Sequence, residues 1–157
     1  MILHILRSEA EDFNALTEIC LKTKRHWGYP DYLMDLWKDE LTITPRYIRN
    51  NDIIKIQNEK GEILGFGTLS QNGSENVYEI KHLWVLPEYS QKSIGRLLLE
   101  YLERKVGHRK TIKVVTDPNA LSFYRKYGYH KVGEAKRKPD GMSLPVLKKI
   151  VERVPEQ

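Results

Sequence analysis

The segment KHLWVLPEYSQKSIGRLLL, residues Lys81–Leu99, decides the fold. It begins as an extended apolar stretch, passes through Pro87 and a short polar turn, and continues as a helix from about Ile94. A helix start of this kind presents main-chain N–H groups and the positive end of the helix dipole to an anionic ligand. The segment therefore predicts an anion site where the strand meets the helix.

A second informative segment is DPNALSFYRKYGYHKVG, residues Asp117–Gly133. It predicts a turn that contains Asn119, followed by a helix that ends in Tyr127-Gly128-Tyr129. Gly128 suits the left-handed conformation with which many helices end.

Composition sets broad limits on the protein class. The chain has 157 residues, of which 40% are hydrophobic and 30% charged, so we expect one domain over residues 1–157 of a soluble globular protein. Its 26 Lys and Arg residues are interleaved with 21 Asp and Glu residues, and the net charge is +5. This charge fits an anionic small ligand or a nucleic acid, and charge alone decides neither.

The single cysteine, Cys20, excludes an intrachain disulfide and fits a reducing compartment. It lies at helical spacing from Leu16 and Ile19, so a buried core thiol is favoured over a nucleophile. No secretion signal is apparent, and no stretch approaches the ~20 apolar residues of a membrane span. We therefore expect a cytoplasmic protein without membrane contact.

The hydrophobic pattern predicts alternating helices and hairpin-connected strands. Ser8 is the expected N-cap of the first helix, and Asn72–Gly73 the expected hairpin turn. The predicted strands are 2–6, 52–57, 63–70, 77–86, 111–115, 129–134 and 144–151, and the predicted helices reach from Ser8 to about 24, then cover 31–41, 45–49, 94–106 and 119–127. This order implies one mixed α/β sheet with helices on both faces.

The two segments, in this order and spacing, resemble the GNAT superfamily of acyl-CoA N-acyltransferases. The resemblance covers nearly the whole chain and implies the GNAT-type mixed, mostly antiparallel central sheet flanked by helices on both faces. It also implies that an acetyl group moves directly from acetyl-CoA to a primary amine in a ternary complex. The stretch HWGY (His26–Tyr29), followed by ELTITP, is similar to a bacterial subgroup without a clear shared substrate.

The resemblance assigns the cofactor site by position. Leu83, Trp84 and Val85 would pair with the pantetheine arm through main-chain groups, and Asn119 would lie near the cofactor. The pyrophosphate would be bound by the turn and helix start, which comprise Gln91, Lys92, Ser93, Ile94, Gly95 and Arg96.

This turn departs from the family pattern Gln/Arg-Gly-x-Gly-x-Gly/Ala, because Gln91 and Ser93 replace the first two glycines. The N–H groups remain and Lys92 and Arg96 add positive charge, so we expect CoA binding to persist. Two alternatives stay open: an ordinary loop-to-helix junction capped by a serine, and a catalytically weak or inactive acyl-CoA-binding or sensing protein.

Two residues are candidates for catalysis by the same resemblance. Tyr124 would lie near the cofactor sulfur. Full proton transfer from a phenol with a pKa of about 10 to a thiolate of about 8.5 is uphill by about 2 kcal/mol, so a hydrogen bond to the leaving thiolate is the safer role. Glu79 would be the base, acting through water because the ordinary pKa of a carboxyl group lies about six units below that of an amine. His82 is the rival base, and a structural role is open for each.

The acceptor side is expected at His26, Trp27 and Tyr29, whose rings could bind an amine by cation–π contact or simply pack the corner between two helices. The acceptor itself, a small molecule or a peptide or protein amine, stays open. The scattered histidines and lone cysteine predict no metal.

A homodimer is possible from the resemblance. The basic residues of 104–110 fit a solvated helix end better than a nucleic-acid site, so no nucleic-acid partner is expected.

Overall fold

The structure is a computed structural model that describes residues 1–71, 73–137 and 140–152. It forms two compact units. Unit 1 comprises Met1–Thr68 and His82–Tyr101, and unit 2 comprises Leu69–Lys81 and the chain from Leu102 onward. The expected single domain stays a prediction, and Asn72 of the expected hairpin turn lies outside the described residues.

The strands follow the hydrogen-bonded order β1-β2-β3-β4-β5-β7-β6. Their bounds are β1 Leu3–Arg7, β2 Ile53–Asn58, β3 Ile63–Gln71, β4 Val77–Val85, β5 Thr111–Val115, β6 His130–Lys136 and β7 Ser143–Ile150. The pairs β1–β2, β2–β3, β5–β7 and β6–β7 are antiparallel, whereas β4 and β5 are parallel. The mixed, mostly antiparallel sheet is confirmed.

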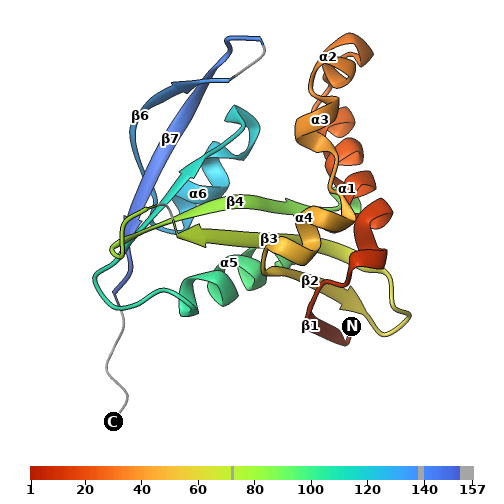
Figure 1. Ribbon diagram of the computed structural model, residues 1–157, viewed down its shortest axis with the longest axis horizontal. Helices are drawn as coiled ribbons and strands as arrows, with labels where there is room; N and C mark the ends of the chain where they lie inside the picture. The colour runs from red at the N-terminus through yellow and green to blue at the C-terminus, as the bar shows by residue number, and fades with distance from the viewer. Residues whose placement is uncertain (72, 138–139, 153–157) are drawn as a thin grey trace. The chain divides into compact units, whose positions relative to one another are not determined.

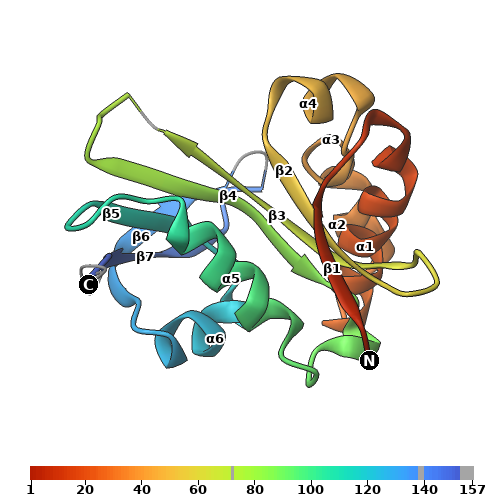
Figure 2. The same cartoon turned by 90° about the horizontal axis from the view of Figure 1, so that it is seen from below.

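Unit 1 contains the N-terminal helices and most of α5. Their bounds are α1 Phe13–His26, α2 Asp31–Leu36, α3 Lys38–Leu41, α4 Pro45–Asn50 and α5 Ile94–Arg104. In this unit α1 and α4 lie on one side of β2 and β3, and α5 lies on the other (Figures 1 and 2). Leu16, Phe66 and Leu98 are fully buried in its core. Cys20 is equally buried and burial raises the pKa of its thiol, so the prediction of a core thiol is confirmed.

The start of the first helix differs from the prediction. The Ser8 N–H donates to the Ile53 carbonyl (2.7 Å), so Ser8 continues the pairing of β1 with β2. Asp12 instead accepts a hydrogen bond from the Glu9 N–H (2.8 Å), and a short 3-10 turn leads into α1. The predicted Ser8 cap was wrong: the Ser8 hydroxyl has no hydrogen-bond partner among the described residues, and Glu9 is the N-cap of the 3-10 turn.

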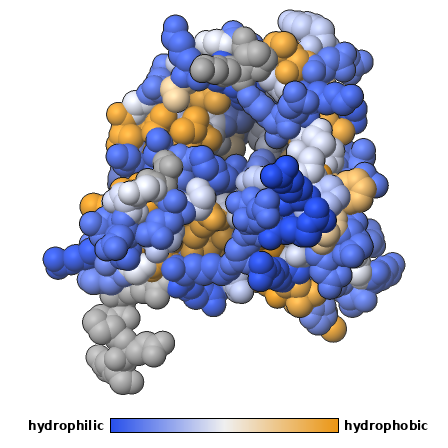
Figure 3. All heavy atoms as spheres, in the orientation of Figure 1, coloured by the Kyte–Doolittle hydropathy of each residue, from blue (hydrophilic) through white to orange (hydrophobic). Residues whose placement is uncertain are grey.

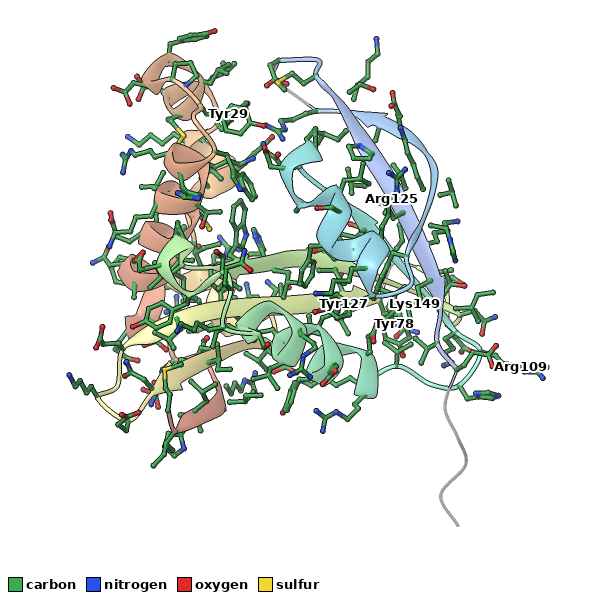
Figure 4. The ribbon with its side chains drawn as sticks, turned by 180° about the vertical axis from the view of Figure 1, so that it is seen from behind. Tyr29, Tyr78, Arg109, Arg125, Tyr127 and Lys149 are labelled. Carbon is green, nitrogen blue, oxygen red and sulfur yellow. The ribbon has the colours of Figure 1, made fainter. Side chains whose placement is uncertain are left out.

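Unit 2 is built from the first half of β4, from β5, β7 and β6, and from α6 (Leu121–Lys126) with the end of α5. Lys149 of β7 donates to Glu103 Oε1 of α5 (3.2 Å) and to the Tyr127 carbonyl at the end of α6 (2.9 Å). Figure 4 shows Tyr127 and Lys149 beside each other. The Tyr129 hydroxyl also donates to Glu103 (2.7 Å). These bonds place both helices against the sheet face that carries Lys149.

Polar residues cover most of the molecular face in Figure 3, and smaller apolar patches interrupt them. Among the described residues, no helix combines the length and the apolar character that crossing a bilayer requires.

Strands β3 and β4 approach closely at Gly65. A Cβ added at this residue would lie 2.6 Å from the Trp84 carbonyl oxygen and 3.1 Å from Leu98. Only glycine permits this approach, because the opposing atom belongs to the main chain and has little room to move. Gly65 therefore fixes the position of β4 at Trp84 and Val85.

Replacing Gly65 with alanine should lower the free energy of unfolding by about 1–3 kcal/mol, because the new methyl group overpacks the strand pair. Urea unfolding followed by tryptophan fluorescence would measure this. The matched control is Gly133→Ala in β6, where a Cβ would meet nothing within 4 Å. Equal stability of the two variants would contradict the close approach.

Candidate active site

The end of β4 in unit 1 has main-chain groups available for a ligand. The Leu86 N–H donates to the Leu64 carbonyl of β3 (2.8 Å), and the Trp84 carbonyl also faces β3 at Gly65. Main-chain groups alternate sides along a strand, so the N–H groups of Leu83 and Val85 point away from β3. The parallel pairing of β4 with β5 ends at Ile80 and Val114, whereas β4 continues to Val85.

Helix α1 supports this strand end. The Thr23 hydroxyl donates to the Val85 carbonyl (3.1 Å) and to the Ile19 carbonyl within α1 (2.8 Å). The Thr23 side chain that makes both hydrogen bonds is buried. The carbonyl of Val85 thus accepts a hydrogen bond from Thr23, whereas no bond from its N–H is found among the described residues.

The turn before α5 is exposed at residues 91–93, and α5 begins at Ile94. The first N–H groups of a helix have no partner within it. In the described part of the chain, the N–H groups of Ile94, Gly95 and Arg96 have no acceptor. This helix start therefore offers hydrogen-bond donors and the positive end of the dipole to an anion.

The backbone of this turn differs between the two positions at which the family pattern has glycine. Ser93 has a φ of 62°, in the left-handed region that glycine adopts most easily, whereas Gln91 does not have a positive φ. Residue 93 therefore keeps a backbone conformation typical of glycine although it is a serine. Residue 91 does not require such a conformation.

Ser93→Gly should raise the free energy of unfolding by about 0.5–1 kcal/mol, because it removes the strain of a Cβ in the left-handed region. Gln91→Gly is the matched control and should lower it by about 0.5–1 kcal/mol through backbone entropy alone. Thermal unfolding of both variants measures the difference. A loss of stability in Ser93→Gly would argue against the positive φ.

Four aromatic rings surround the ammonium group of Lys24, which is only 4% exposed. Its Nζ lies 4.9–5.7 Å from the ring centroids, which belong to Trp27, Tyr29, Trp37 and Trp84. Contacts of this length are cation–π interactions. We call these four rings and Lys24 the Lys24 cage. It joins the end of α1, the corner before α2, the residue that follows α2 and strand β4.

The cage changes the interpretation of the expected acceptor wall. Trp27 and Tyr29 do form part of a cation site, but the cation in it is the chain's own Lys24. His26 is exposed and has no ring contact among the described residues. Figure 4 shows Tyr29 at the corner between α1 and α2. Lys24 was not predicted from the sequence, although its i, i+3 spacing from Trp27 was a usable signal.

Lys24→Ala should lower the free energy of unfolding by about 2–4 kcal/mol, because it removes the cation–π contacts and leaves a cavity. Lys22→Ala, two residues away and exposed, should change it by less than about 0.5 kcal/mol. Calorimetry of both variants tests this. A Lys24→Ala protein as stable as Lys22→Ala would show that the cage does not stabilise the fold.

His82 is held by its neighbours in unit 1. The Trp84 Nε1–H donates to His82 Nδ1 (3.0 Å), and the imidazole packs edge-on against Tyr47 and at a tilt against Phe66. Because Nδ1 accepts this bond, a neutral His82 carries its proton on Nε2. It could accept a further proton only by breaking the bond to Trp84, so this geometry favours a structural role.

Glu79 in unit 2 is 8% exposed and is paired with two lysines. Its carboxylate contacts Lys81 of the same strand, and Lys113 Nζ lies 3.6 Å from its Oε1. Lys113 is its register partner on β5. Glu79 is therefore the centre of an ion-pair cluster, which the sequence analysis missed because Lys113 is brought there only by strand pairing.

Asn119 and Tyr124 also lie in unit 2. Asp117 Oδ1 accepts hydrogen bonds from both the backbone N–H (2.8 Å) and the side-chain amide (2.9 Å) of Asn119, which fixes its orientation. Tyr124 is 3% exposed and packs edge-on against Phe123 and Tyr129. Burial raises the pKa of its phenol, so Tyr124 stays protonated and can act only as a hydrogen-bond donor to an anion.

Among the described residues, no group of three or more His, Cys, Asp and Glu side chains could hold a metal ion. The donors at the start of α5 and at the end of β4 are main-chain N–H groups, which suit an anionic and hydrogen-bonding ligand.

Comparison with known proteins identifies the family. The model of the Acetyltransferase (GNAT) family matches residues 10–129, and the chain belongs to this family. It is 23% identical over 132 residues to the peptidyl-lysine N-acetyltransferase YiaC of Escherichia coli, covering 82% of this chain and 84% of that protein.

Solved structures share the fold. The PaiA N-acetyltransferase of Thermoplasma acidophilum in complex with coenzyme A has a TM-score of 0.71 and 20% identity, with 96% of this chain and 99% of that chain covered. Apo YjaB of Escherichia coli has a TM-score of 0.69 and 22% identity, with 96% and 98% covered. The GNAT-type fold expected from the sequence is confirmed.

Proposed function

We propose that this protein transfers an acetyl group from acetyl-CoA to a primary amine in a ternary complex. Membership of the acetyltransferase family supports the reaction class. The observation that carries the proposal is the start of α5, where three successive N–H groups lack an acceptor in the described chain beside an exposed turn with Ser93 at positive φ. This arrangement suits a pyrophosphate without glycines at 91 and 93.

The cofactor would be held mainly by main-chain atoms. The N–H groups of Leu83 and Val85 would pair with the amide groups of the pantetheine arm as a neighbouring strand does. Lys92 and Arg96 would add positive charge near the pyrophosphate, although Arg96 also bonds Glu100 (3.1 Å). The solved PaiA structure, which shares this fold, is a complex with coenzyme A, and this supports coenzyme A as the ligand.

In the proposed reaction the amine nitrogen attacks the thioester carbonyl, the C–S bond breaks, and the thiolate of CoA leaves. The Tyr124 phenol would donate a hydrogen bond to that thiolate, for which its protonated state is suited. The amine must first lose a proton. The Glu79 carboxylate is paired with two lysines, and His82 Nδ1 already accepts a hydrogen bond from Trp84. Because both residues are engaged in this way, transfer of the amine proton to solvent water is the simplest route.

The acceptor is a small-molecule or a peptide amine. YiaC is named for peptidyl-lysine, which favours a polypeptide acceptor here. The Lys24 cage is already filled, so we infer that the acceptor ammonium is not bound by these four rings. A cytoplasmic location and a homodimer stay predictions.

The test is release of CoA thiol from acetyl-CoA in the presence of an amine panel, together with calorimetric titration of CoA. Tyr124→Phe should lower turnover at least about tenfold with little change in CoA affinity, because it removes only a donor to the leaving group. Tyr127→Phe, on the same turn of chain, is the matched control and should keep its turnover.

Two outcomes would change the proposal. CoA binding without thiol release for any amine would make the chain an acyl-CoA-binding protein, the alternative that the constrained Glu79 favours. Unchanged turnover in Tyr124→Phe would remove Tyr124 from the mechanism.

A further inference from the structure

One face of the unit 2 sheet carries a row of cationic side chains. Glu79 of β4 is in register with Lys113 of β5, Lys113 with Lys148 of β7, and Lys148 with His130 of β6. Residues directly opposite one another across strands lie on the same face. Lys81, two residues from Glu79, joins them. We call Lys81, Lys113, Lys148 and His130 the cationic row.

The cationic row is accessible, whereas part of the opposite face is covered by helices. Lys81, Lys148 and His130 are exposed, and Ile150 beside them is 58% exposed. The opposite face carries Lys149, whose bonds to Glu103 and Tyr127 place the helices of unit 2 on that side.

The charge of this face is incompletely balanced. Lys113 and Lys148 stand directly opposite each other, and like charges in this position destabilise a sheet. Glu79 contacts Lys113 and Lys81 at one end of the row, whereas Lys148 and His130 lie at the other end. A carboxylate arriving at Lys148 would relieve the repulsion.

Unit 2 as a whole also carries a positive net charge. Unit 2 contains fifteen Lys and Arg residues and eight Asp and Glu residues, so its net charge is +7. Unit 1 contains eleven and thirteen, which gives −2. A charge asymmetry of this size steers an anionic partner toward unit 2.

We propose that the cationic row docks an acidic, extended polypeptide segment, which belongs to the protein that brings the acceptor amine. The side chains between the cations on this face are Val77, Thr111, Val115, Val146 and Ile150. They suit a peptide whose carboxylates alternate with aliphatic residues, because side chains of an extended chain alternate sides. Apart from the His130 imidazole, no aromatic ring lies among the described residues of this face, so it lacks the series of stacked rings that single-stranded nucleic acids bind.

This inference rests on the proposed acetyltransferase activity for its biological meaning, but its binding step is independent of transfer. Docking would bring an acceptor polypeptide to the end of the row that holds Glu79. It would also select lysines or N-termini with acidic neighbours.

Binding is tested with a fluorescein-labelled peptide of alternating Glu and Val that lacks lysine and has a blocked N-terminus. Fluorescence anisotropy should show binding to the full-length protein that weakens as salt is raised. Lys148→Glu should weaken it about fivefold or more. The matched control is Lys136→Glu, an exposed β6 residue whose neighbour Ser143 lies on the other face, and it should weaken binding less than about twofold.

Several results would overturn the proposal. Equal weakening by both variants would mean that the peptide is attracted only by the net charge. Absence of peptide binding would exclude the peptide site. Tighter binding of oligo-uridine RNA than of the peptide would also exclude it. A dimer in sedimentation velocity that Lys148→Glu dissociates would assign the face to a second copy of the chain.

Transfer is then compared for two lysine peptides that differ only in acidic or neutral flanks. The wild type should prefer the acidic peptide about fivefold in kcat/KM, and Lys148→Glu should lose this preference but keep its rate on the neutral peptide. Equal rates on both peptides in the wild type would overturn docking while leaving the acetyltransferase proposal intact. Absence of transfer to both, with peptide binding retained, would instead refute the activity.

Discussion

Unsatisfied main-chain hydrogen-bond donors are the constraint on which the candidate site depends. Strand β4 continues beyond its pairing with β5, and α5 starts with three N–H groups that have no acceptor in the described chain. Backbone donors of this kind do not require particular side chains. This explains how a turn can lose two glycines of the family pattern and still suit a pyrophosphate.

The surrounding contacts hold these donors in place. Gly65 lets β3 approach β4, Thr23 ties α1 to Val85, and the Lys24 cage joins the N-terminal helices to Trp84. Each contact acts on the same few residues of β4. A buried lysine enclosed by aromatic rings therefore serves here as an internal connection between α1, the residues around α2 and β4.

The sequence predicted the elements well because helix and strand periodicities are local. The positions of the strands from β2 to β7 and of α5 and α6 were predicted to within a few residues. The helix cap at Ser8 was wrong because pairing with Ile53 is a long-range interaction. The positive φ of Ser93 could not be predicted, since serine rarely adopts it.

Side-chain partners were the hardest part to predict. Trp27 and Tyr29 were identified, but Trp37 and Trp84 enter the Lys24 cage from distant segments, and the Glu79 cluster depends on the register of β4 with β5. The Lys24 cage and the Glu79 cluster show that a candidate site residue identified from sequence can already be bound by another residue of the same chain. The roles of Tyr124 and Glu79 in catalysis stay predictions.

The most direct test of the account is amide hydrogen exchange, read residue by residue by NMR, with and without coenzyme A. Main-chain binding predicts that coenzyme A slows exchange at Leu83, Val85, Ile94, Gly95 and Arg96, because each N–H gains an acceptor. Saturating coenzyme A that leaves all five exchange rates unchanged would contradict it.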